Sequence, residues 1–192
     1  MLLTLHNQDK KTWASSVCFL LYRYGFGHVW QNQGVGNINQ FLSIFKARLK
    51  DCYQQEWHFE LQSRSRFSFY NTFKSTLSLT PYLVSAKCVS TRSALTRMRL
   101  GVSPLRPHRL RYTVNIPTIN MNCPFCPDVR ETEIHFLLIC PKYQELRERY
   151  IPRKFWIRPS SFALAILLAN ENTTIVSNLS TFVYKAFQTR CV

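Results

Sequence analysis

Four residues in the second half of the chain have the types and spacing of metal ligands. Two cysteines are separated by two residues, and a histidine and a third cysteine follow them: Cys123, Cys126, His135 and Cys140. The pattern C-x2-C-x8-H-x4-C offers three thiolates and one imidazole, the ligand set of a closed structural zinc site. Four protein ligands fill the tetrahedron, so the pattern predicts one structural zinc ion and no open position for a catalytic water.

The spacing between the last two ligands requires a break in regular helix geometry. Residues five apart on a continuous helix point about 140° away from each other, so His135 and Cys140 could hardly meet one ion. The residue before a proline is disfavoured in the α region, and Pro141 follows Cys140 directly. We therefore expect His135 on a short helical turn, Cys140 in a non-helical elbow and Pro141 as the first residue of the next helix. The apolar residues 137–139 are expected to pack on the core.

Other uses of these cysteines stay open at this point. A disulfide between Cys126 and Cys140, or between Cys123 and Cys126, fits poorly with a reducing compartment. The seven cysteines are odd in number and irregular in spacing, which does not favour a fully paired disulfide framework. A Cys/His nucleophile pair would need a third orienting group, which the sequence does not indicate. The four cysteines outside the pattern are most simply buried or free thiols: Cys18, Cys52, Cys88 and Cys191.

The chain carries no recognisable export or membrane signal. Residues 1–7 are a short apolar start without a basic n-region. The longest apolar run, residues 162–169, falls well short of the roughly 20 residues that a bilayer span requires. We expect no membrane partner and an intracellular location, in the nucleus, the cytoplasm or both.

The charge is strongly positive and unevenly distributed. The chain has 25 Lys and Arg against 10 Asp and Glu, a net charge of +15. Glu60 and Asp128 are consecutive acidic residues, and all the charged side chains between them are basic. A long segment of one sign attracts polyanions, so we predict RNA and/or DNA as a partner. The candidate phosphate contacts are Arg92, Arg97, Arg99, Arg106, His108, Arg109 and Arg111. The alternatives are a solvated basic face or a surface for an acidic protein.

The apolar spacing predicts a mainly α fold, an irregular helical body with a small C-x2-C-x8-H-x4-C zinc module. We expect a helical connector-like region over 1–90, a basic segment plus zinc module over 91–150 and a C-terminal helical pair over 151–192. The expected helices cover about 13–24, 37–57, 90–101, 141–150, 160–169 and 172–186, and residues 67–77 are expected to form a helix or an irregular segment. Charged side chains are expected on their solvated faces: Arg92, Arg97 and Arg99 on one helix, and Glu145, Arg147, Glu148 and Arg149 on another.

Several segments between residues 91 and 150, a third of the chain, resemble one family. They are Thr91-Arg-Ser-Ala-Leu-Thr-Arg-Met-Arg-Leu-Gly, Ser103-Pro-Leu, Cys123-Pro-Phe-Cys126, Glu133-Ile-His-Phe-Leu-Leu-Ile-Cys140-Pro and Leu146-Arg-Glu-Arg. Together they resemble the zinc-binding region that follows the polymerase in non-LTR (LINE-type) retrotransposon reverse transcriptases. The resemblance implies a module that helps the polyprotein hold template RNA or target DNA during target-primed reverse transcription. It also implies the same four zinc ligands, and other parts of the polyprotein as partners.

The chain departs from related patterns in ways that bear on activity. The histidine lacks a preceding glycine, and the eight-residue gap differs from the retroviral zinc knuckle, so that knuckle's mode of base recognition is not expected. The Asp-Asp metal motif of the polymerase is absent, and no clustered carboxylates suggest a nuclease. We therefore expect a non-enzymatic, zinc-binding and nucleic-acid-binding protein. The alternative is a structural or protein-interaction module in which zinc only staples the fold.

Overall fold

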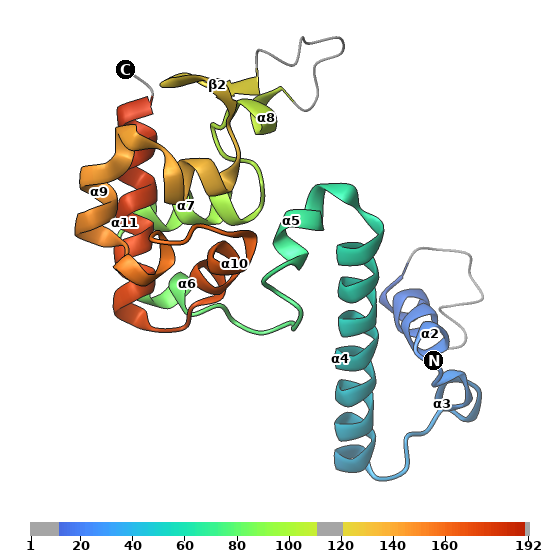
Figure 1. Cartoon of the computed structure of the whole chain (residues 1–192). Helices are drawn as coiled ribbons and strands as arrows, with labels where there is room; N and C mark the ends of the chain where they lie inside the picture. Colours follow the sequence, from blue (N-terminus) through green and yellow to red (C-terminus); the bar gives the residue numbers. More distant parts are fainter. Residues whose placement is uncertain (1–11, 111–120, 191–192) are drawn as a thin grey trace. The chain divides into compact units, whose positions relative to one another are not determined.

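The chain divides into two compact units, Met1–Phe59 and Glu60–Val192. The computed structural model describes residues 12–110 and 121–190, and each unit is described by itself (Figure 1). The region boundaries predicted from the sequence, after residues 90 and 150, differ from this division. Helix α4, Ile38–Ser63, runs from the first unit into the start of the second.

The first unit packs two short helices against the first turns of α4. Helix α2, Trp13–Arg23, begins where the Thr12 hydroxyl accepts a hydrogen bond from the Ser15 amide. It ends before Gly25, whose φ of 87° is a left-handed conformation that favours glycine. Helix α3, Gly27–Asn32, follows directly. The core of this unit consists of Ala14, Cys18, Leu21, Val29 and Trp30, with Phe26, Phe41 and Phe45 packed against it.

The second unit begins with short elements and one longer helix. They are η1 (Ser65–Phe67), α5 (Ser68–Asn71), α6 (Tyr82–Ser85), α7 (Val89–Arg99) and α8 (Arg106–Arg109). Helix α7 ends before Gly101, which has a φ of 64°. Within residues 67–77 only the end of η1 and α5 are helical, so the second half of this segment follows the irregular alternative. The predicted helix before Gly101 is present.

The rest of the second unit contains a two-stranded hairpin and the C-terminal helices. The elements are β1 (Asn122–Cys123), β2 (Cys126–Arg130), η3 (His135–Ile139), η4 (Pro141–Tyr143), α9 (Gln144–Tyr150), η5 (Arg153–Phe155), α10 (Ser161–Ala169) and α11 (Thr173–Arg190). Helix α10 is capped at its start, because the Ser160 hydroxyl accepts a hydrogen bond from the Ala163 amide at 3.0 Å.

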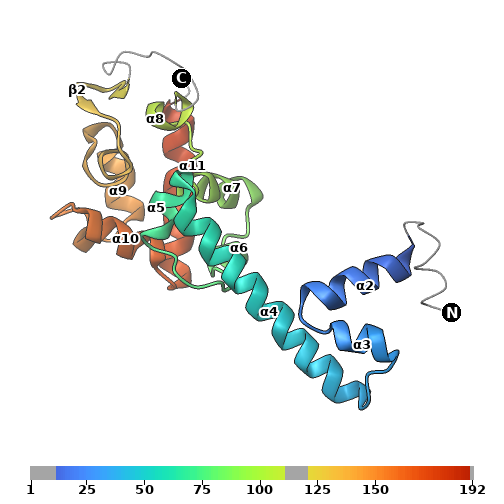
Figure 2. The same ribbon diagram turned by 90° about the vertical axis from the view of Figure 1, so that its right-hand side faces the viewer.

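The core of the second unit is organised around α11. This helix packs against α6, α7 and α9, and α9 and α11 lie side by side in both views (Figure 2). Its spacing predicts a buried stripe of Ile175, Leu179, Phe182, Val183 and Ala186, and all of these are buried except Ile175, which is half-buried. The η3 turn contributes Phe136, Leu137 and Leu138 to the same core. The mainly α fold with a small Cys/His module is therefore confirmed. None of the helices in the described ranges is long and apolar enough for a membrane crossing.

Candidate metal centre

The four predicted ligands converge in space. The donor atoms of Cys123, Cys126, His135 and Cys140 all lie within 4.8 Å of one another. The Sγ atom of Cys140 is 3.8 Å from that of Cys123 and 3.9 Å from that of Cys126. Ligands about 2.3 Å from a tetrahedral zinc ion are about 3.8 Å apart. A disulfide requires about 2.05 Å, and all three cysteines are free thiols, so the cluster has the dimensions of a metal site.

The first two ligands are positioned by the hairpin. Strands β1 and β2 are antiparallel, and Cys123 is paired with Cys126 across the ladder. Only Pro124 and Phe125 separate them, and the proline presets the backbone of the tight turn. Both thiols are therefore presented from one end of the hairpin, as the C-x2-C spacing predicts.

The second pair is positioned by a π-type turn followed by an elbow. The Cys140 amide donates to the His135 carbonyl at 2.6 Å, an i to i+5 bond that brings residues five apart to adjacent positions. Cys140 itself is extended, with φ −53° and ψ 122°, and Pro141 begins η4. The expected helical turn, elbow and proline-led helix are all present. Within the turn Leu137 and Leu138 are buried as expected, whereas the expectation for Ile139 was wrong, because one turn cannot direct every side chain inward.

The histidine provides an independent sign that a metal fits this cluster. His135 is 4% exposed, and neither of its buried ring nitrogens has a hydrogen-bond partner. An unpartnered buried polar group is costly, so native structures rarely tolerate one. Coordination of one ring nitrogen to a metal ion would remove much of this cost. Three soft thiolates and one imidazole suit zinc among the common metals.

The protonation of the ligands couples metal binding to pH. Burial raises the pKa of the Cys140 thiol to about 12, and burial also raises the pKa of Cys126. Burial lowers the pKa of His135, and the nearby Arg147 cation lowers it further. Without metal, the Cys126 and Cys140 thiols are thus protonated at neutral pH. A metal must displace these protons, so its affinity rises with pH.

A buried arginine supports the turn that carries the ligands. Arg147 is 1% exposed. Its Nε donates to the Leu137 carbonyl at 3.0 Å, and its Nη2 donates to the Cys140 carbonyl at 2.8 Å. The expectation that Arg147 lies on the solvated face of its helix was wrong, because these two carbonyls draw the guanidinium inward. A zinc ion bound by three thiolates would carry a net charge of −1, which this cation would offset.

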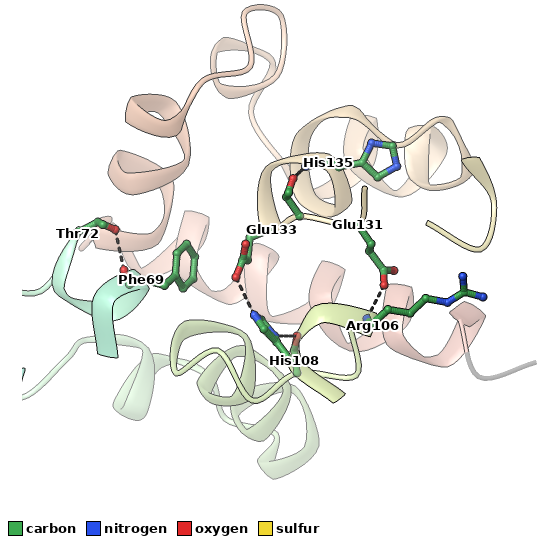
Figure 3. Close-up of polar contacts among 9 residues, drawn as sticks. Phe69, Thr72, Arg106, His108, Glu131, Glu133 and His135 are labelled. Carbon is green, nitrogen blue, oxygen red and sulfur yellow. Dashed lines mark hydrogen bonds and ion pairs between the residues drawn. The ribbon is translucent and has the colours of Figure 1, made fainter. Parts of the chain in front are cut away.

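Two glutamates fix the segment that connects the hairpin to the π-type turn (Figure 3). The buried Glu131 carboxylate accepts from the Arg106 amide at 2.6 Å and from the Arg190 guanidinium at 2.7 Å. Glu133 Oε1 lies 2.7 Å from His108 Nε2. The segment is thereby tied to α8 and to the end of α11. The sequence analysis did not predict these anchors, although two acids shortly before a ligand histidine, in a strongly basic chain, were a usable signal.

Two predicted phosphate contacts are buried and have other roles. Arg99 is 3% exposed, donates to the Leu168 carbonyl, and lies 4.8 Å and 4.9 Å from the ring centroids of Phe73 and Tyr82. Its expected exposed position was wrong, because it satisfies a carbonyl at the end of α10. His108 is buried as well, and both of its ring nitrogens already have partners: Ser103 Oγ lies 2.6 Å from Nδ1, and Glu133 Oε1 lies 2.7 Å from Nε2.

The other predicted phosphate contacts differ in whether their side chains are exposed or already bonded to a carbonyl. Arg97 and Arg109 are exposed. Arg92 donates to the Leu83 carbonyl at 3.0 Å, and the half-buried Arg106 donates to the Asn122 carbonyl at 3.0 Å. Arg111 lies outside the described residues.

Arg97 and Arg109 line one groove of about 630 Å³ on the second unit. The hydroxyl groups of Ser90 and Ser93 and the carboxamide of Gln188 supply further polar groups along it. Ser103 and His108 also line this groove, and His108 is the residue bound to Glu133. The groove is therefore connected by hydrogen bonds to the segment that carries His135.

Comparisons with protein-family models, with curated proteins and with solved structures found no match to this chain.

Proposed function

We propose that this chain is a non-enzymatic nucleic-acid-binding protein folded around one structural zinc ion. We further propose that it derives from the C-terminal part of a non-LTR retrotransposon reverse transcriptase polyprotein and acts inside the cell. The observation that carries the proposal is the cluster of Cys123, Cys126, His135 and Cys140, which has tetrahedral dimensions and an unpartnered buried imidazole. The lineage rests on the quoted sequence segments.

The zinc ion is assigned a structural role because the protein supplies all four ligands. Three of the four residues are buried, and the fourth is half-buried, so the cluster is closed to a substrate. When bound, zinc supplies a crosslink between the hairpin and the π-type turn. The chain's own residues then hold that crosslink in place: Arg147 from α9, and Glu131 through α8 and α11.

The groove beside α7 supports the nucleic-acid part of the proposal. Its lining residues include Arg97 and Arg109 and no aspartate or glutamate. Guanidinium groups bind phosphate oxygens in two-point hydrogen bonds, and serine hydroxyls bind them as well. Such contacts carry no sequence information, so binding is expected to be largely sequence-independent and strongly salt-sensitive.

Replacing both groove arginines tests this role. Arg97→Ala/Arg109→Ala is expected to weaken RNA and DNA of different sequences to a similar extent, because phosphate contacts are lost. The slope of log affinity against log salt should fall in magnitude by about 1 to 2. Fluorescence anisotropy with labelled oligonucleotides at several salt concentrations measures both quantities.

A control outside the groove is Arg23→Ala in the first unit, which removes one positive charge where the groove variant removes two. Arg23 is exposed and paired with Glu56 at 2.9 Å, so its loss removes a cation that is already neutralised. We expect it to leave affinity nearly unchanged. Loss of affinity confined to one sequence in the double variant, or an unchanged salt slope, would argue against phosphate binding in the groove.

A protein-interaction module is the second candidate, favoured by apolar side chains on the first unit. Trp13, Phe19 and Phe59 are each more than half exposed. Isolated exposed apolar residues are common, but several on one small unit are typical of interaction surfaces. Indifference to both RNA and DNA at low salt would favour this candidate over nucleic-acid binding.

A further inference from the structure

A second pocket of the Glu60–Val192 unit has the composition of a nucleotide site. It has a volume of about 740 Å³ and lies beside the end of α9 and the following η5 turn. Its lining residues are Gln144, Glu148, Arg149, Tyr150, Ile151, Pro152, Arg153, Trp156 and Asn178. None of these residues belongs to the predicted metal or phosphate contacts. Ligand sites are usually about 300–1,000 Å³, so the pocket has room for one nucleotide.

Two aromatic side chains line the pocket, and one of them is fixed in place. The Trp156 indole N–H donates to the Ile151 carbonyl at 2.9 Å, and Ile151 is buried in the core. The half-buried indole is therefore held in one orientation. Tyr150 also lines the pocket, with the Lys185 ammonium 5.3 Å and the Arg149 guanidinium 5.5 Å from its ring centroid. A fixed aromatic plane is a stacking platform for an unpaired base, because every base has a π face.

Cations surround these rings. Arg149 and Arg153 line the pocket and are exposed. The sequence contains no acid between Glu148 and Glu171, whereas Arg149, Arg153, Lys154 and Arg158 lie in that interval. Guanidinium groups at the rim would bind the phosphates on either side of a stacked base.

The remaining polar groups suit the edge of a base. The Glu148 carboxylate accepts from the Gln144 carboxamide at 2.6 Å, and Asn178 faces the same pocket from α11. A carboxylate repels phosphate but accepts hydrogen bonds from base amino groups. Carboxamides both donate and accept. These groups are all satisfied when the edge of the base lies inside the pocket and the phosphates of the nucleotide contact Arg149 and Arg153 at the rim.

We propose that the Trp156 pocket binds an unpaired nucleotide, so that the chain holds a single-stranded segment of RNA or DNA here. This inference rests on the proposed nucleic-acid function and adds a strand preference to it. Bases within a duplex are stacked on each other and do not offer their faces, so a duplex would contact the groove of Arg97 and Arg109 without entering this pocket.

The test compares Trp156→Leu with Trp156→Phe, using the full chain with its metal. Both variants lose the hydrogen bond to Ile151, but only phenylalanine keeps an aromatic ring. Trp156→Leu should weaken binding of a labelled oligothymidine about 5- to 150-fold, the effect of losing one stacked base, and leave a duplex of equal length unaffected. Trp156→Phe should keep most of the single-strand affinity. Thermal unfolding of both variants checks that they fold.

A second variant keeps the test decisive if Trp156→Leu does not fold. Arg149→Ala/Arg153→Ala changes only exposed side chains, and it should lower single-strand affinity more than duplex affinity. Equal single-strand affinity in the wild type, Trp156→Leu and this double variant would overturn the proposal that the pocket binds a nucleotide. Duplex binding that depends on Arg97 would still support the proposed nucleic-acid function. A wild-type chain that binds neither form would overturn both.

Discussion

Cys140→Ser is expected to abolish metal binding and to unfold the region around residues 121–143. Cys140 is fully buried, and a serine hydroxyl is a poor zinc ligand, so the substitution leaves two thiols and an imidazole without their ion. Structural zinc contributes about 10–16 kcal/mol to the folding of small zinc modules. A whole domain is stable by only about 5–15 kcal/mol. Loss of the cooperative unfolding transition, followed by circular dichroism, is the expected result.

The effect should spread beyond the module because the π-type turn belongs to the main core. Phe136, Leu137 and Leu138 pack in the same cluster as Phe182 and Val183 of α11. Cys88→Ser is the matched control, since Cys88 is an exposed cysteine outside the cluster. It should unfold like the wild type. An unchanged unfolding temperature in Cys140→Ser would show that no metal contributes to the fold.

The same prediction has a pH signature. Protons compete with the metal for the thiolates, so metal-linked stability is present at neutral pH and is lost as pH falls. Burial raises the pKa of the Cys140 thiol from 9.0 to about 12, so the metal must displace a proton from this thiol at neutral pH. The unfolding temperature of the metal-bound chain, followed by circular dichroism, is therefore expected to fall as pH is lowered from neutral, and a chelator at neutral pH should remove the cooperative transition as Cys140→Ser does.

Arg147→Met is expected to destabilise the second unit by about 2–5 kcal/mol and to weaken metal binding about 10- to 100-fold. Methionine fills similar space, but the buried carbonyls of Leu137 and Cys140 each lose a donor, and the Cys140 carbonyl keeps only the Tyr143 amide at 3.2 Å. The anionic metal–thiolate centre also loses its nearby cation. Urea unfolding and competition with a zinc chelator measure the two effects.

Arg149→Met is the matched control for this stability measurement. Arg149 lies two residues further along α9 and is exposed, so its replacement should change stability by less than about 0.5 kcal/mol. Equal stability of the two variants would mean that the bonds from Arg147 to the turn contribute nothing. Destabilisation without any change in metal affinity would restrict Arg147 to a packing role.

The ligands and their elbow were predictable because their signals are local. The C-x2-C spacing defines a tight turn, and Pro141 forbids Cys140 from continuing a helix, so both features follow from a few adjacent residues. The helical stripe on α11 was predictable for the same reason, since its apolar residues repeat at the helical period.

The burial of Arg99 and Arg147 was not predictable, because the backbone carbonyls that accept their hydrogen bonds are brought near them only by the tertiary fold. Arg99 donates a hydrogen bond to a carbonyl 69 residues away in the sequence. Arg147 donates to two carbonyls of the π-type turn and the elbow that follows it. Helical periodicity places charged residues outside, and only the tertiary fold shows which carbonyls need a donor. His108 was misplaced in the same way, by partners that no local pattern connects to it.

The most direct test is the metal content of the purified, reduced protein, measured by elemental analysis beside Cys123→Ser/Cys140→Ser. The geometry of the cluster predicts about one zinc ion per wild-type chain and none in the double variant. Zinc at that stoichiometry, lost in the variant, would establish the centre on which the fold and the groove depend. A reduced wild-type chain without metal, or a variant that keeps its zinc, would contradict the assignment of these four ligands.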